Sequence, residues 1–160
     1  MSIVGSLIHF FMERRAKNSS FDELAQKLVD NGPILANQMA VATDTPANRA
    51  KAEHVIGIER WAQNRLKVAL GNPLVIDEYT KYQPKNAKGF RELSSLFTKT
   101  RADTLKLVKQ LKQADAGDMK VRHNDMGDIT VKTWLYYLSA HAARELGKIK
   151  NKPAKKIIRA

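Results

Sequence analysis

Hydrophobic residues recur every three or four positions over most of this chain, which is the spacing of one face of an α-helix. The pattern predicts a short amphipathic helix near the N-terminus and four long helices, over about 21–39, 46–70, 90–113 and 130–151. No run of alternating β-branched residues indicates a strand. We therefore expect an all-α fold.

Helix-capping residues support these boundaries. Ser20 and Glu23 have the spacing of a capping box, and Thr45 followed by Pro46 is typical of a helix start. Pro33 interrupts the first long helix, because proline has no N–H to donate and its ring clashes with the preceding turn. That helix is therefore expected to be either kinked or split at Pro33.

The segment 73–89 is long for a connection between helices, where about 2 to 8 residues is usual. Such a length permits a crossover along the helices, so that the second and third long helices can run parallel. Residues 114–128 are expected to form a polar loop. The prediction is a single domain over 1–160, a four-helix bundle with an N-terminal extension at 1–20 and a basic tail at 152–160.

Composition argues against several classes of protein. No stretch of about 18 apolar residues is present to span a bilayer, and the apolar N-terminal stretch lacks the basic start and cleavage site of a signal peptide. The absence of cysteine excludes disulfides and thiolate catalysis by the chain itself, and it fits a cytoplasmic location. The net charge is +12, but the basic residues are scattered and no nucleic-acid recognition motif accompanies them. We therefore expect neither a membrane span nor specific binding to nucleic acid.

The apolar face of the last predicted helix contains two residues that can titrate or bind a metal, His141 and Glu145. A buried carboxylate is costly unless it is paired, hydrogen-bonded or metal-bound. His54 borders the inward face of the second long helix. These residues form a candidate metal site of two histidines and one carboxylate, with Glu59 as a fourth ligand or as a hydrogen-bond partner of an imidazole.

The same residues also fit a purely structural interpretation. In this alternative Glu145 hydrogen-bonds His141 or pairs with Arg101, which falls near the apolar side of the third long helix, and the cluster holds the helices in register. His123 either bonds backbone groups of its own loop or faces the mouth of a pocket. Tyr137, four residues before His141, is the better of two neighbouring tyrosines to line that pocket.

Three segments of the chain resemble the DinB/YfiT-like metalloenzyme family: HVIGIERWAQNRL (54–66), FTKTRADTLKLVKQL (97–111) and HNDMGDITVKTWLYYLSAHAARELGKI (123–149). The resemblance implies a four-helix bundle in up-down-down-up order. It also implies a divalent metal held by three histidines, one from the second helix and two from an H-x-x-x-H motif in the last. His54 and His141 fall on two of these positions, whereas Glu145 stands in place of the third histidine.

The function that the resemblance implies is that of a metal-dependent enzyme. Similar proteins transfer or isomerise substrates with a low-molecular-weight thiol, and a bound metal lowers the pKa of a coordinated thiol or water. A transferase or hydrolase-like activity on a small molecule is therefore expected, with no residue assigned as catalytic. A carboxylate ligand shifts the preference away from nitrogen-rich coordination, so nickel, zinc, iron and manganese are all candidate metals.

The resemblance further implies a homodimer. The alternative function, of a different class, is a non-catalytic helical bundle in which the histidine, glutamate and arginine cluster is structural. Metal content discriminates between the two.

Overall fold

The computed structural model of the chain describes residues 3–149 and residue 151. The basic tail predicted at 152–160 lies outside these residues. The described part is mostly helical, as expected, and its α-helices are α1 (Ile3–Lys17), α2 (Phe21–Ala40), α3 (Pro46–Leu66), α4 (Phe90–Gln113) and α5 (Val131–Leu146). Two short 3₁₀ helices and a two-stranded sheet complete it: η1 (Lys67–Leu70), η2 (Tyr79–Tyr82), β1 (Lys120–His123) and β2 (Gly127–Thr130).

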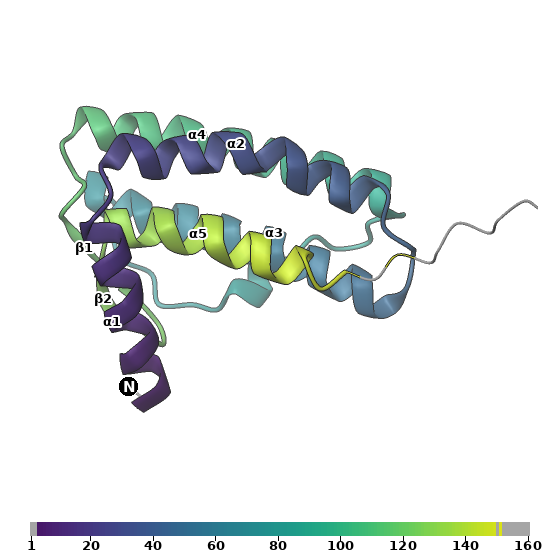
Figure 1. Ribbon diagram of the computed structural model, residues 1–160, viewed down its shortest axis with the longest axis horizontal. Coiled ribbons are helices and arrows are strands. Elements are labelled where there is room, and N and C mark those ends of the chain that lie inside the picture. Colours follow the sequence, from purple (N-terminus) through teal and green to yellow (C-terminus); the bar gives the residue numbers. More distant parts are fainter. Residues whose placement is uncertain (1–2, 150, 152–160) are drawn as a thin grey trace, which may run out of the picture.

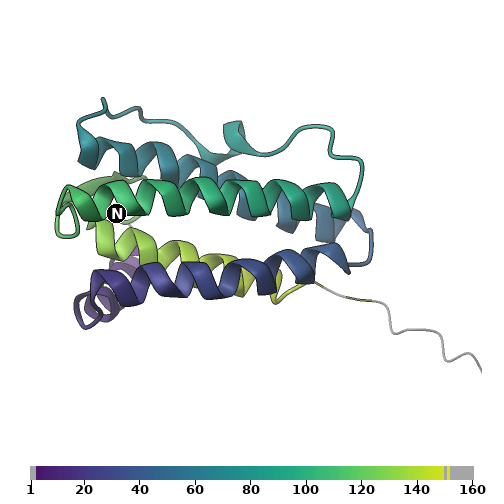
Figure 2. The same ribbon diagram turned by 90° about the horizontal axis from the view of Figure 1, so that it is seen from above.

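The long helices α2 to α5 lie side by side, and α2 and α3 each pack against both α4 and α5 (Figure 1). Helices α3 and α4 run in the same direction, opposite to α2 and α5 (Figures 1 and 2). The connection between α3 and α4 returns along α3 and contacts it through η2. Helix α1 packs against α5 and β2 at one end of the long helices. None of the described helices has both the length and the apolar character that a membrane span requires.

The predicted helix caps are present. The hydroxyl of Ser20 accepts a hydrogen bond from the Glu23 backbone N–H at 3.2 Å, and the Ser20 N–H donates to the Glu23 carboxylate at 2.7 Å. The Thr45 hydroxyl caps α3, whose first residue is Pro46, by accepting from the Asn48 N–H. The caps confirm where α2 and α3 begin, because each satisfies backbone donors that have no partner inside the helix.

Helix α2 continues through Pro33, so the alternative of two separate helices is wrong. The neighbouring Gly32 lies against Arg101 of α4, where an added Cβ would come within 3.2 Å of the Arg101 Cγ. Arg101 also donates to the Leu28 backbone carbonyl at 2.9 Å. The Arg101 side chain thus packs against α2 beside Pro33 and donates a hydrogen bond to the Leu28 carbonyl, one turn earlier in the helix.

The polar loop predicted at 114–128 is wrong in part, because it contains β1 and the start of β2. The two strands pair antiparallel, with Val121 opposite Ile129 and His123 opposite Gly127. Each strand has four residues, and only alternate positions are buried. Charged residues occupy exposed positions between the buried ones, so the sequence shows too few apolar residues to indicate a strand. The Trp134 indole N–H donates to the Val121 carbonyl at 3.2 Å and ties the hairpin to α5. The hairpin thereby places His123 against the helices.

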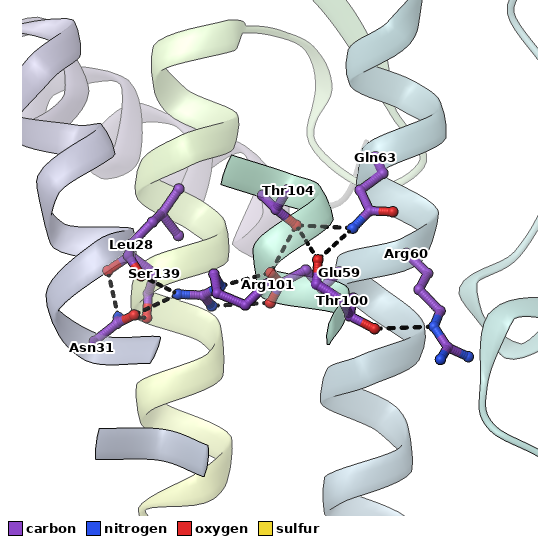
Figure 3. Close-up of polar contacts among 9 residues, drawn as sticks. All are labelled: Leu28, Asn31, Glu59, Arg60, Gln63, Thr100, Arg101, Thr104 and Ser139. Atoms are coloured by element: carbon purple, nitrogen blue, oxygen red, sulfur yellow. Dashed lines mark hydrogen bonds and ion pairs between the residues drawn. The ribbon is translucent and has the colours of Figure 1, made fainter. Parts of the chain in front are cut away.

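A buried polar layer crosses the four long helices (Figure 3). Arg101 of α4 donates to the Glu59 carboxylate of α3, at 2.7 Å from Nε to Oε1 and 2.9 Å from Nη2 to Oε2. Thr104 donates to Glu59 at 2.8 Å, and on the other side Arg101 donates to Asn31 of α2, whose amide reaches Ser139 of α5 at 2.9 Å. These contacts connect all four helices through charged or polar side chains.

The layer falls between two separate hydrophobic clusters. On each long helix, its residues stand between a member of one cluster and a member of the other. The first cluster includes Leu28, Trp61, Leu107 and Leu138, and the second includes Leu35, Val55, Phe97 and Ala142. A polar group in this layer loses its present partner when the helices shift, so the layer favours the observed register of the helices.

Candidate ligand and metal site

Helices α3 and α5 bring two histidines together. His54 of α3 and His141 of α5 lie with their Nε2 atoms 3.1 Å apart, within hydrogen-bond distance. His141 is buried and His54 is partly buried. One ring carries a proton on Nε2 and donates it to the other ring, since two bare lone pairs at this distance would repel. Residues 87 apart in the sequence therefore form one polar pair.

Both imidazoles are held in the neutral form. Burial, together with the nearby His54 and Arg144, lowers the pKa of His141 to about 4. Burial is also the main cause that lowers the pKa of His54, although the Glu145 charge opposes the shift. A neutral imidazole has a lone pair to offer, and this is the form in which histidine binds a metal.

Glu145, the third predicted ligand, is not drawn into this pair. Its carboxylate accepts hydrogen bonds from Lys148 at 2.9 and 3.0 Å and from the Nε of Arg144 at 3.0 Å. Burial alone would raise the pKa of Glu145, but these two cations outweigh burial and lower it. In the part of the chain that the structure describes, no group of three histidine, aspartate or glutamate side chains is arranged to hold a metal ion.

Glu59 and Arg101 were predicted near the histidines, and the structure corrects this. Both belong to the polar layer of Figure 3, where each is almost fully buried and each is the other's ion-pair partner. The pairing of Arg101 with Glu145 that the structural alternative assumed is wrong for the same reason. Position explains the choice of partner. Glu59 faces α4 across the core, within reach of Arg101, whereas Glu145 lies near the end of α5.

Further aromatic rings contact both members of the histidine pair. Tyr79 contacts His54 edge-on at 4.8 Å between ring centroids, and Tyr137 lies 5.2 Å from His141. Tyr137 in turn contacts His123 at 5.3 Å, and His123 contacts Trp61 at 5.1 Å. Burial raises the pKa of Tyr137 well above its ordinary value, so its hydroxyl remains protonated.

These rings form the wall of a cavity of about 450 Å³. The volume is within the usual range for a small-molecule site. The structure places Tyr137 and His123 at this cavity beside the histidine pair, and also Tyr136, the neighbour that we expected to be the weaker candidate. The residues that line it are Met12, His54, Ile58, Trp61, Glu78, Tyr79, His123, Asn124, Asp125, Met126, Tyr136, Tyr137, Ala140, His141 and Arg144.

His123 has one satisfied and one unsatisfied nitrogen. Its Nδ1 accepts from the backbone N–H groups of Asp125 at 3.1 Å and Met126 at 3.3 Å, so the proton of the neutral ring is on Nε2. Burial lowers the pKa of His123 to about 4, which keeps the ring neutral. Its Nε2 is buried and has no hydrogen-bond partner among the described residues. A buried donor without an acceptor costs about 1–3 kcal/mol, so an acceptor atom that reached this nitrogen would remove that cost.

Three hydrogen bonds to one backbone carbonyl, that of Asp77, hold the connection between α3 and α4 against this wall; we call this group of contacts the clamp. The Asp77 carbonyl accepts from the indole of Trp61 at 3.2 Å, from Arg65 at 3.1 Å and from Asn124 at 3.0 Å. Arg65 is buried, and its other acceptor is the Asn124 side chain at 2.8 Å. The clamp therefore joins α3, the connection and the turn between β1 and β2.

A glycine allows the connection to approach α3 closely. A Cβ at Gly57 would lie 2.7 Å from the Gln83 Cγ and 3.1 Å from the Tyr79 carbonyl oxygen. Sequence reasoning did not assign Tyr79 to the site. Gly57 was the signal that could have found it, because a glycine inside a helix often marks a close backbone approach.

Comparison with known proteins identifies no relative. No family model matches this chain, and neither a curated protein nor a solved structure matches it.

Proposed function

We propose that this chain is a four-helix bundle of the DinB type, in up-down-down-up order, that binds a divalent metal between α3 and α5. His54, His141 and Glu145 are the proposed ligands, and the adjoining cavity holds a small-molecule substrate. The directions of α2 to α5 and the long connection between α3 and α4 support the bundle order (Figures 1 and 2).

The distance between the two histidines is the observation that carries this proposal. Their Nε2 atoms are 3.1 Å apart. Two nitrogens that bind one metal at the usual zinc–nitrogen bond length are about 2.9–3.4 Å apart, depending on the angle at the metal. The pair already has the spacing of one edge of a coordination shell. To bind a metal through both Nε2 atoms, the ring that now donates would carry its proton on Nδ1 instead, so that each neutral ring offers an Nε2 lone pair.

Glu145 completes the site if its side chain turns from Lys148 and Arg144 toward the histidines. These cations are 53% and 65% exposed, respectively. Ion pairs with exposed cations are weak because water screens them, so metal coordination can displace them. Three protein ligands would leave positions open on the cavity side, as in catalytic metal centres.

The chemistry that the metal would supply is a lowered pKa of a bound thiol or water, which makes either a nucleophile at neutral pH. Aromatic side chains of the chain line the adjoining cavity, and the Tyr137 ring lies 5.2 Å from the ring of His141. This arrangement supports a metal-dependent transferase, isomerase or hydrolase acting on a small molecule.

The proposal is tested by titrating zinc, nickel and manganese into chelator-treated, untagged protein. We expect near-stoichiometric uptake of at least one metal by the parent protein. His54→Ala and His141→Ala should each abolish uptake, and Glu145→Gln should weaken it at least tenfold. Asp103→Asn, which changes an exposed carboxylate of α4, is the control and should bind as the parent does.

Absence of uptake by the folded parent protein would exclude the metal site. Uptake that survives Glu145→Gln unchanged would reduce the ligand set to the two histidines.

The second candidate is a non-catalytic helical bundle. It is supported by the direct hydrogen bond between His54 and His141, which satisfies both Nε2 atoms without a metal. It is also supported by the Glu59–Arg101 pair, which accounts for the glutamate and arginine as register-setting residues. In this case His54→Ala and His141→Ala change only the free energy of unfolding, and no metal binds.

A further inference from the structure

Two adjoining rings in the cavity wall, those of Tyr137 and His123, carry hydrogen-bond donors that have no acceptor in the described part of the chain. The first is the Tyr137 hydroxyl, on a ring held between His123 and His141. It forms no hydrogen bond with any described residue. A tyrosine hydroxyl is ordinarily protonated at neutral pH, so it is a donor there.

The second donor is the Nε2–H of His123. The backbone N–H groups of Asp125 and Met126 occupy Nδ1 and thereby fix the ring proton on Nε2. The residue is 5% exposed, and Nε2 has no partner within the described residues. The rings that carry the two donors, those of His123 and Tyr137, are in edge-on contact with centroids 5.3 Å apart, and both line the cavity.

The rest of the wall suits a flat apolar body. Aromatic, methionine and aliphatic side chains make up much of the lining, and the remaining lining residues include charged groups. The apolar residues are Met12, Ile58, Trp61, Met126, Tyr136 and Ala140. Among the charged lining residues, Arg144 adds a positive charge near His141, whereas Glu78 and Asp125 add negative charges.

We propose that this cavity binds a planar, largely apolar molecule that carries a carboxylate or carbonyl oxygen, and that this oxygen accepts hydrogen bonds from Tyr137 and His123. The inference rests on the proposed function only in placing the ligand in the same cavity, since neither donor needs a metal. The Nε2 of His123 is buried, so its hydrogen bond to the ligand requires the rings of the wall to shift on binding.

The test uses the metal-free full chain and three probes: 2-naphthoate, 2-naphthaldehyde and naphthalene. Isothermal titration calorimetry should show that naphthoate and the aldehyde bind and that naphthalene binds at least tenfold more weakly, because it has no oxygen acceptor. Tyr137→Phe removes only the hydroxyl and should raise the dissociation constant of naphthoate about tenfold, while leaving that of naphthalene unchanged. Tyr136→Phe, in the same wall, is the matched comparison and should raise the dissociation constant of naphthoate less than Tyr137→Phe does.

Nitrogen-15 NMR of the imidazoles gives a second readout. In the free protein the proton of His123 should be on Nε2, and its signal should move downfield with naphthoate but not with naphthalene. Equal affinity for naphthoate and naphthalene, equal effects of Tyr137→Phe and Tyr136→Phe, a proton on Nδ1, or no binding of either oxygen-bearing probe would each overturn the inference.

The two proposals fail separately. Protein that takes up metal but discriminates none of the probes would overturn the ligand class alone. Protein that binds naphthoate through Tyr137 but takes up no metal would overturn the metal site alone. His54→Ala helps to separate them, because it should abolish metal uptake and leave the effect of Tyr137→Phe on naphthoate in place.

Discussion

Arg101 and Glu59 form a buried, two-point ion pair, in which Nε and Nη2 of the guanidinium donate to the two carboxylate oxygens at 2.7 and 2.9 Å. Neither side chain is more than 4% exposed. Together with Asn31 and Ser139, the pair connects α2, α3, α4 and α5 between two hydrophobic clusters. A charged pair at this place contributes to the alignment of the helices, because each charge has its partner in only one register.

Removing one member of this pair is expected to be severely destabilising. Glu59→Gln or Arg101→Met leaves the other group buried without its partner, which costs about 3–5 kcal/mol of unfolding free energy. The double variant Glu59→Leu with Arg101→Met should recover a large part of that loss, because no charge is then buried. Urea unfolding followed by circular dichroism measures all three.

The exposed pair of Lys112 and Asp22 provides the comparison, and Asp22→Asn should cost less than about 1 kcal/mol. Single variants of Glu59 and Arg101 that cost no more than this control would show that the layer does not hold the fold.

The buried histidines predict that stability is lost in mild acid. The pKa of His123 is about 4 in the folded chain because burial disfavours the charged ring, against an ordinary value of 6.5. The unfolded chain therefore takes up this proton first, so the contribution of neutral His123 is complete above pH 6.5 and falls as the pH drops toward 4. The upper limit of this loss is about 3 kcal/mol.

Urea unfolding at several pH values between 7.5 and 4.5 tests this sign. The neutral variant His123→Phe should be less stable than the parent at pH 7.5, because two backbone N–H groups lose their acceptor. The difference in unfolding free energy between this variant and the parent should become smaller as the pH falls toward 4.5. A constant difference across the range would mean that His123 titrates normally in the folded protein.

Gly57→Ala should displace the connection from α3. The added methyl carbon would lie 2.7 Å from the Gln83 side chain and 3.1 Å from the Tyr79 carbonyl, which is closer than packed atoms tolerate. We expect a loss of about 1–3 kcal/mol and faster hydrogen exchange over residues 77–83, as overpacking forces the backbone to move. The ring contact of Tyr79 with His54 should weaken with it.

Gly89→Ala is the matched control for this substitution. Gly89 has an extended backbone, and an added Cβ there meets only one atom, the Asp44 Oδ2 at 3.9 Å. It should leave stability and hydrogen exchange nearly unchanged. An equal effect of the two substitutions would argue against close packing of the connection on α3.

Asn124→Ala should release the clamp at Asp77. Asn124 donates to the Asp77 carbonyl and accepts from Arg65, so its loss leaves the buried guanidinium with one fewer acceptor. A hydrogen bond to a buried charged group contributes about 1.5–3 kcal/mol, and we expect a loss of that size in urea unfolding. Trp61 lines the cavity beside this clamp, so a shift in tryptophan fluorescence should accompany it.

The helical character of the chain and the capped starts of α2 and α3 could be predicted from the sequence, because they depend on residues three or four positions apart. Ser20 and Glu23 satisfy each other within one turn, and the apolar spacing alone identifies the inward face of each helix. His54 and His141 could be singled out for the same reason, as polar groups on or beside such faces. The hairpin could not, because its short strands bury only alternate residues and are stabilised by α5.

Only the tertiary structure decided which of these groups meet. Arg101 could pair with Glu145 or Glu59 on helical spacing alone, and it pairs with Glu59 because α3 and α4 face each other there. The fold also brought Tyr79 of the connection onto His54, whereas Glu145 pairs with Lys148 only three residues further along the chain. Helical periodicity states which side of a helix is buried, but the partner of each buried side chain depends on how the helices are rotated and shifted against one another.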